Sequence, residues 1–115
     1  MAKIAVASTD GKVVNQHFGR ADTFYILETD ENNNFTCVEI RKLPPVCEGG
    51  EHDDNNMKKR VQSLADCEYV LVSRIGIRAE NELNNAGIDV YEIPGYIEES
   101  VDKLMKYLAI QNMFK

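Results

Sequence analysis

The two histidines of this 115-residue chain stand in two short segments that could bind a ligand, and the second segment also contains a cysteine. His17 opens a run of histidine, phenylalanine, glycine and arginine, and His52 follows Cys47 by five residues with two glycines between them. A thiolate is a soft ligand and an imidazole a borderline one, so this set suits zinc, copper or an iron–sulfur cluster. The two glycines would let the second segment fold closely around a bulky ligand. His17, Cys47 and His52 are therefore candidate metal ligands.

The spacing of these residues leaves other interpretations open. Cys47 and His52 match no closed zinc motif, because no second pair stands at finger spacing. They could be ordinary members of an acidic loop, and His17 could fix its own loop by hydrogen bonding to the backbone. The chain has three cysteines and no Cys-x-x-Cys pair, which favours reduced thiols over a disulfide framework. The other two, Cys37 and Cys67, are expected to be packing residues.

Residues 73–78, with the sequence Ser-Arg-Ile-Gly-Ile-Arg, join an expected strand to an expected helix. Free N–H groups and the helix dipole favour an anion at such a junction, although a single glycine, Gly76, makes the signal weak. Arg20, Arg74 and Arg78 could converge there on a negatively charged ligand. Solvation of the protein surface is an equally good explanation for any one of these arginines.

The hydropathy pattern predicts five strands and three helices. Mostly apolar runs indicate strands, and a polar link at residues 30–34 favours antiparallel pairing of the two strands beside it. Apolar residues at helical spacing indicate the helices. The strands are expected at residues 3–9, 24–29, 35–43, 68–73 and 88–93, and the helices around 57–65, 79–86 and 97–108. The order β-β-β-α-β-α-β-α implies an α/β fold, in which helices pack on a five-stranded mixed sheet.

This topology would bring the candidate ligands to one edge of the sheet. If the first three strands form an antiparallel meander, the first and third run the same way, and right-handed crossovers make the last two parallel to them. The carboxyl ends of these strands then share an edge, where ligands of open α/β sheets usually bind. The loops at that edge, residues 10–23, 44–56, 73–78 and 94–96, contain both histidines, Cys47 and the three arginines.

Composition and charge exclude several classes of protein. With 43% apolar and 28% charged residues, residues 1–115 are expected to form a single globular domain. The net charge of -6, with the acidic excess concentrated in residues 44–56, disfavours nucleic acid as a partner. No apolar run approaches the ~20 residues of a membrane span, and the N-terminal apolar run is too short for a signal peptide. We therefore expect a cytoplasmic protein that does not associate with membranes.

The sequence also lacks the main motifs of catalysis. It contains no nucleophile elbow, no P-loop and no complete dinucleotide-binding glycine motif. A nuclease with carboxylates around two metals would find Asp10 at a suitable strand end. However, Ser73 and Arg74 stand where a second carboxylate would be needed. The sequence therefore predicts that the chain is not an enzyme.

Residues 5–25 carry a resemblance to a known family. They include the pattern D-G-x-x-V-x-x-H-F-G, from Asp10 to Gly19, which closely resembles the opening of the dinitrogenase iron–molybdenum cofactor biosynthesis family. Less specific similarity covers nearly the whole chain. The family includes small carriers of the NifX and NafY type and a C-terminal domain attached to some NifB proteins. The resemblance implies a ribonuclease H-like fold.

Family members in nitrogenase systems carry iron–sulfur clusters between assembly proteins. The resemblance therefore implies that this chain transiently binds an iron–sulfur cluster, either the iron–molybdenum cofactor or a precursor. It also implies cofactor-assembly proteins as donor and acceptor partners, and carriage of the cluster without catalysis. The competing interpretation is a regulatory or protein-binding module of the same fold with no bound cluster.

The resemblance also assigns roles by position. His17 matches the histidine implicated in cluster binding, and Cys47 and His52 fall in a variable loop where other members place possible ligands. Gly76 matches a glycine-bearing turn, although members commonly have a second glycine where this chain has Arg74 or Ile75. The residues expected to bind the cofactor are His17, Phe18, Gly19, Arg20, Arg74, Gly76 and Arg78.

Overall fold

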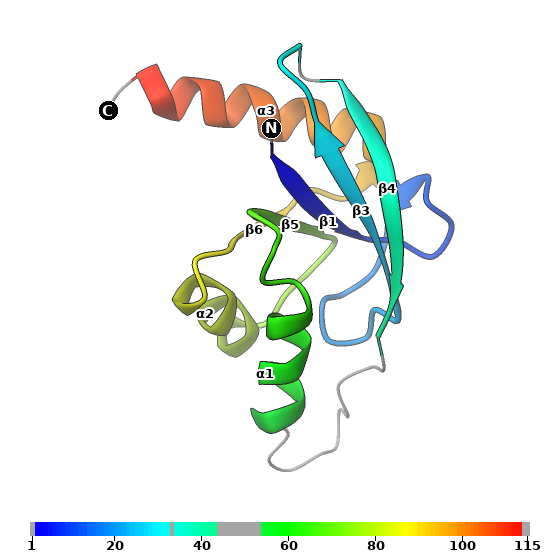
Figure 1. Cartoon of the computed structure of the whole chain (residues 1–115), viewed down its shortest axis with the longest axis vertical. Helices are drawn as coiled ribbons and strands as arrows, with labels where there is room; N and C mark the ends of the chain where they lie inside the picture. Colours follow the sequence, from blue (N-terminus) through cyan, green and yellow to red (C-terminus); the bar gives the residue numbers. More distant parts are fainter. Residues whose placement is uncertain (1, 33, 44–53, 114–115) are drawn as a thin grey trace.

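The protein is built on a mixed sheet of five strands, in the order β4-β3-β1-β5-β6 (Figure 1). The structure is a computed structural model and describes residues 2–32, 34–43 and 54–113. Antiparallel pairing joins β1 to β3 and β3 to β4, whereas β1, β5 and β6 are parallel neighbours. The predicted five-stranded mixed sheet is thus confirmed. Its strands are β1 (Lys3–Ala7), β3 (Thr23–Thr29), β4 (Phe35–Lys42), β5 (Tyr69–Val72) and β6 (Asp89–Glu92).

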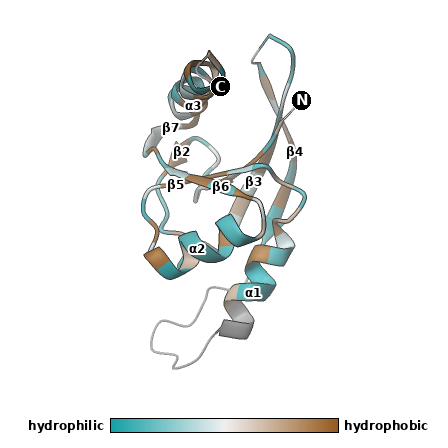
Figure 2. Ribbon diagram, turned by 90° about the vertical axis from the view of Figure 1, so that its left-hand side faces the viewer, coloured by the Kyte–Doolittle hydropathy of each residue, from teal (hydrophilic) through white to brown (hydrophobic). Residues whose placement is uncertain are grey.

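Three helices cover the two faces of this sheet. The helices α1 (Asp54–Ser63) and α2 (Ile77–Asn85) pack on one face, and α3 (Ile97–Met113) lies on the other (Figure 2). The strand β1 is buried on both sides, since Ala5 and Ala7 face α1 and α2 while Ile4 and Val6 face α3. Burial on both faces explains why its sequence is a continuous apolar run without polar alternation.

The first strand ends two residues earlier than the sequence predicts. Ser8 is buried, and its Oγ accepts hydrogen bonds from the backbone N–H groups of Asp10 at 3.3 Å and Gly11 at 2.9 Å. These bonds curl the chain into a turn, which ends β1 at Ala7.

A second, two-stranded sheet was not predicted from the sequence. It pairs β2 (Val13–Val14) antiparallel with β7 (Gly95–Tyr96). Two residues are too few to show a hydropathy period, so no pattern marks these strands. The pairing fixes the start of the loop that follows β1 beside the start of α3, where the backbone N–H of Ile97 also donates to the carbonyl of Lys12 at 2.8 Å.

The prediction that Cys37 and Cys67 are packing residues is confirmed for Cys67 and wrong for Cys37. Cys67 is buried, with 3% of its surface exposed, but Cys37 is exposed. Cys37 lies on β4, an edge strand of which the middle is exposed, because the helices pack over the inner strands. A bulge at Val38, where the pairing with β3 skips one residue, further disturbs the alternation of this strand. Among the described residues, no helix is long and apolar enough to cross a membrane.

Candidate functional site

The carboxyl ends of β1, β5 and β6 meet at one edge of the sheet, as parallel strands require. There the loop after β1 contacts the turn after β5 through an isolated parallel bridge between His17 and Arg74. The backbone N–H of Phe18 donates to the carbonyl of Arg74 at 2.9 Å, and that of Ser73 donates to the carbonyl of Gln16 at 3.0 Å. The structure therefore places two of the predicted site residues, 57 positions apart in sequence, side by side.

His17 itself is exposed at the start of a tight turn. Its carbonyl accepts hydrogen bonds from the N–H groups of Arg20 at 3.1 Å and Ala21 at 2.9 Å, so the backbone around His17 is fixed locally. Gly19 has open space where a Cβ would be, and Arg20 is exposed. The imidazole is thus presented to solvent from a backbone that is held by hydrogen bonds on both sides.

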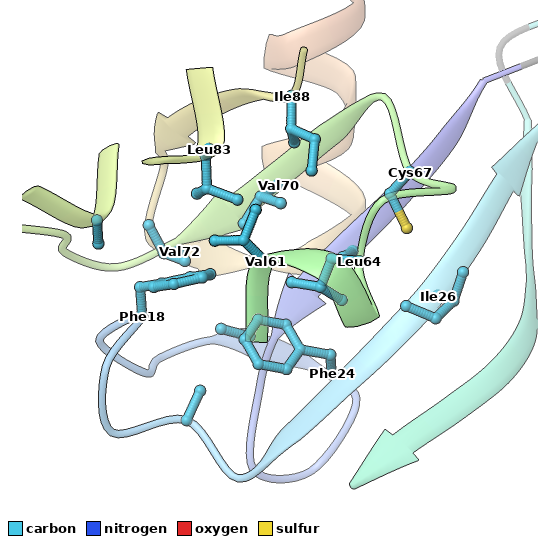
Figure 3. Close-up of a cluster of buried hydrophobic side chains, with 14 residues drawn as sticks. Phe18, Phe24, Ile26, Val61, Leu64, Cys67, Val70, Val72, Leu83 and Ile88 are labelled. Atoms are coloured by element: carbon cyan, nitrogen blue, oxygen red, sulfur yellow. The ribbon is translucent and has the colours of Figure 1, made fainter. Parts of the chain in front are cut away.

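Phe18 plays a different part from its neighbours in this turn. Its side chain is fully buried in the core beneath α1 and α2, where its ring packs edge-on against Phe24 with 5.9 Å between the centroids (Figure 3). The predicted contact of Phe18 with a cofactor is therefore not available to its side chain. Phe18 instead anchors the turn, so that one apolar residue in the core holds the exposed histidine before it.

The turn after β5 leads into the N-terminus of α2. Gly76 is the N-cap residue, and no side chain makes a capping hydrogen bond there. The carboxylate of Glu92 accepts a hydrogen bond from the N–H of Ile75 at 2.8 Å, which fixes the turn against the end of β6. Arg74 and Arg78 are both exposed on either side of the cap. The backbone bridge to Arg74 thus joins the His17 turn to the segment that begins α2, whose N-terminus carries the positive end of the helix dipole.

The Gly76 backbone does not itself require glycine. Its φ of -79° and ψ of 158° are open to other residues, and an added Cβ would meet nothing within 4 Å. Gly76 therefore leaves free space at the turn, which suits close approach of a ligand to the backbone.

Sequence reasoning missed one residue of this region, Arg60 on α1. It is 4% exposed, and its Nη1 donates to the carbonyl of Phe18 at 2.9 Å. Its guanidinium lies 5.6 Å from the centroid of the Phe18 ring and 5.5 Å from that of Phe24. Burial lowers the pKa of Arg60 to about 10, with the charge of Asp22 opposing the shift, so the side chain is protonated at neutral pH.

A signal for Arg60 was present in the sequence. It stands three residues after Met57 and immediately before Val61, within the apolar face that indicated the helix. A cation inside an apolar stripe is a candidate for burial against a hydrogen-bonding partner, because a charge that leaves water must be paired.

The other predicted metal ligands, Cys47 and His52, lie outside the described residues. Within residues 2–32, 34–43 and 54–113, no three His, Cys, Asp or Glu side chains come close enough together to hold a metal ion. The described site therefore consists of one exposed imidazole, the exposed arginines of its own turn and of the turn bridged to it, and the N-terminus of α2. Such a donor set suits an anionic, metal-containing ligand that brings most of its own coordination shell.

Comparison with known proteins identifies relatives along almost the whole chain. The chain is 41% identical over 103 residues to the FeMo cofactor biosynthesis protein NifB of Chlorobaculum tepidum, covering 85% of the chain and 22% of that protein. It is 34% identical over 104 residues to the NifB of Frankia alni, covering 88% of the chain and 20% of the relative. The chain thus spans about a fifth of the length of these relatives.

Solved structures share the fold. The NMR structure of a protein from Thermotoga, assigned provisionally to NifB, superposes with a TM-score of 0.65 and 29% identity, covering 92% of this chain and 89% of the other. A crystal structure from Methanocaldococcus jannaschii, provisionally called a dinitrogenase, gives a TM-score of 0.59 at 14% identity, with 91% and 88% covered, and shows the fold alone. The sequence profile of the family described as dinitrogenase iron–molybdenum cofactor matches residues 1–107. The chain is a member of this family, as the pattern around His17 predicted.

Proposed function

We propose that the protein binds an iron–sulfur cluster, the iron–molybdenum cofactor or a precursor of it, as cargo and carries it between cofactor-assembly proteins. The observation that carries the proposal is the exposed His17, held beside Arg74 and the N-terminus of α2 by the parallel bridge. The NifB relatives are named for biosynthesis of this cofactor, which supports the choice of cargo.

The chemistry of the site fits reversible binding. A neutral imidazole can occupy an open iron position of a cluster without enclosing the cluster. The exposed guanidinium groups of Arg74 and Arg78, with the helix N-terminus, would balance the negative charge of the cargo. Cys47 and His52 remain proposed as further ligands. A cluster that is held by only a few protein ligands is released easily. The protein would therefore carry the cluster without transforming it chemically.

We also propose that the fold is ribonuclease H-like and that the protein is cytoplasmic. The strand order β4-β3-β1-β5-β6, in which β3 alone runs opposite to the other four strands, supports a ribonuclease H-like assignment. Exchange of a cluster between assembly proteins further fits a cytoplasmic protein.

One observation favours a second candidate function, a module that binds a partner protein and carries no cluster. Val38 and Ile40 on β4 are 48% and 54% exposed, and both are large apolar side chains on an edge strand. Exposed apolar residues of this kind are common where another protein docks. The two functions differ in what the purified protein retains.

The experiment that tests cargo binding is anaerobic loading of the apo protein with a synthetic iron–sulfur cluster or extracted cofactor, followed by gel filtration. Iron content and the visible spectrum are compared among wild type, His17→Ala, Cys47→Ala and the exposed control Asn112→Ala on α3. We expect wild type and the control to retain iron and His17→Ala to lose most of it. Absence of iron from wild type would contradict cargo binding and favour the protein-binding module.

A further inference from the structure

We propose that Arg60 is the positioning residue of this site, because it holds the turn that aims His17 at its ligand. No feature of the family match assigns a role to this residue. The inference rests on the proposed function for its ligand, but the geometry that it concerns is a property of the protein alone.

The hydrogen bond from Arg60 falls on the peptide group between Phe18 and Gly19, the second one after His17. The Phe18 carbonyl accepts from Arg60 Nη1 at 2.9 Å, while the Phe18 N–H donates to Arg74 at 2.9 Å. Two successive peptide planes are therefore held by two different elements, α1 from inside and the β5 turn from the edge. The His17 carbonyl lies in the plane that Arg74 holds, and Arg60 holds the next plane, so the two together fix the backbone that leaves His17.

The guanidinium is also held in place itself. It lies within 5.6 Å of the centroids of both Phe18 and Phe24, and both rings are fully buried. A planar cation over aromatic faces gains from the electrostatic attraction of the rings, and the flat group packs where an ammonium would not. Arg60 thus contacts the turn at two points, the ring of Phe18 and the backbone carbonyl of Phe18.

The free energy of unfolding alone does not explain why a cation, Arg60, is buried at this position. Transfer of a guanidinium from water into a core is costly, and an apolar side chain of similar volume is often as stabilising or more so. A buried charge can nevertheless be retained because its hydrogen bonds select a single conformation. The conformation fixed here is that of the His17 turn.

The proposal is tested by combining Arg60 and His17 variants in a double-mutant cycle. Arg60→Met keeps an unbranched apolar stem and removes the donors and the charge, and Arg60→Lys keeps the charge on a compact ammonium group. Val61→Ala is the matched control, since it removes buried methyl groups from the next position of the same helix and the same core. Each protein is loaded with the synthetic cluster, and retained iron and the electron paramagnetic resonance spectrum are measured.

We expect Arg60→Met to retain cluster about tenfold less tightly, at the lower end of the loss seen when groups that orient a metal ligand are removed. Arg60→Lys should fall between wild type and Arg60→Met, and Val61→Ala should match wild type despite a lower melting temperature. In the His17→Ala background, Arg60→Met should cause no further loss, and its spectrum as a single variant should shift toward that of His17→Ala. An equal loss in both backgrounds, or wild-type retention by Arg60→Met, would overturn the positioning role.

A measurement on the apo protein separates this inference from the proposed cargo. Hydrogen exchange of the Phe18 and Ala21 amides reports whether the turn is held, since the Ala21 N–H donates within the turn to His17 and the Phe18 N–H donates across to Arg74. We expect exchange at these two amides to accelerate about tenfold or more in Arg60→Met relative to the amides of β5, and not in Val61→Ala. If wild type retains no cluster but this difference appears, cargo binding fails and the positioning of the turn stands. Unchanged exchange of the Phe18 and Ala21 amides in Arg60→Met would contradict the positioning role, whichever cargo the protein binds.

Discussion

Arg41 and Asp66 form a two-bonded ion pair that ties the edge strand β4 to the segment after α1. The Nη1 atom of Arg41 donates to Oδ1 of Asp66 at 2.8 Å, and Nη2 donates to Oδ2 at 2.7 Å. Nη1 also donates to the carbonyl of Ser63, the last residue of α1, at 2.7 Å. A single guanidinium therefore connects the outermost strand to the C-terminus of the helix that carries Arg60.

The first prediction concerns the stability that Arg41 contributes through Asp66 and through Glu39, whose two carboxylate oxygens it also contacts at 2.9 Å. Arg41→Met, which keeps the aliphatic stem, should lower the free energy of unfolding by about 1 kcal/mol, the upper range for pairs that solvent still reaches. The measurement is urea denaturation followed by circular dichroism. Lys106→Met is the control, because its pair with Asp102 at 2.9 Å is largely exposed and should be worth much less. Equal effects of the two substitutions would contradict this ranking.

The second prediction is a pH dependence that arises from the same pair. The hydrogen bonds from Arg41 hold the pKa of Asp66 well below its usual value of 3.8. A carboxyl with a lowered pKa in the folded state stabilises the protein above its unfolded pKa, and that contribution disappears as pH falls through the folded pKa. Stability should therefore decline below pH 4, and Asp66→Asn should decline less steeply over the same range. Parallel curves of urea midpoint against pH for the two proteins would refute the assignment.

The third prediction is a difference in reactivity between the two described cysteines. Burial, with a smaller effect of the adjacent Asp66 charge, raises the pKa of the Cys67 thiol to about 12. Cys67 should therefore stay protonated and unlabelled by iodoacetamide at pH 8 until the protein unfolds, whereas exposed Cys37 should label in the native state. Peptide mapping by mass spectrometry, with and without urea, distinguishes the two thiols. Native labelling of Cys67 at the rate of Cys37 would contradict the burial.

The sequence was sufficient to predict the main sheet, because its signals are local or depend on topology rules. The strand β1 is marked by its apolar run, and the parallel arrangement of β5 and β6 follows from the right-handed crossovers. These rules also predicted that His17 and Arg74 would reach the same edge. The exposure of Cys37 was beyond reach, because it depends on where the helices lie over an edge strand and on a bulge.

The contacts within the site were less predictable. The bridge between His17 and Arg74 is a long-range pairing of single residues, which leaves no period in the sequence. Arg60 was assigned no role from the sequence, and charges on helices usually face water. Only the packed structure shows that this cation is buried against Phe18 and Phe24.

The fourth prediction concerns Gly76 at the N-cap of α2. Because neither its φ nor any neighbour within 4 Å requires glycine, Gly76→Ala should change the free energy of unfolding by less than about 1 kcal/mol, since alanine is a poorer N-cap residue but lowers the entropy of the unfolded chain. If the cluster approaches the backbone there, the added methyl group should still reduce cluster retention. The measurement pairs urea denaturation with iron retained after gel filtration. Gly11→Ala is the contrast, since the φ of Gly11 is 77° and an added Cβ would lie 2.8 Å from the Tyr25 ring. The Gly11→Ala variant should therefore lose more unfolding free energy than Gly76→Ala.

The fifth prediction tests the charge beside His17. The parallel bridge keeps Arg74 next to the histidine through backbone bonds alone, so Arg74→Gln should leave the turn intact and remove only the cation. Retention of an anionic cluster should then weaken about fivefold at low salt, the equivalent of ~1 kcal/mol for a partly exposed charge. The deficit should shrink at 0.5 M salt, because ions screen exposed charges. Lys103→Gln removes an exposed cation on α3, on the other face of the sheet, and should have no such effect. A salt-independent loss in Arg74→Gln would indicate that the arginine shapes the turn and does not attract the cargo.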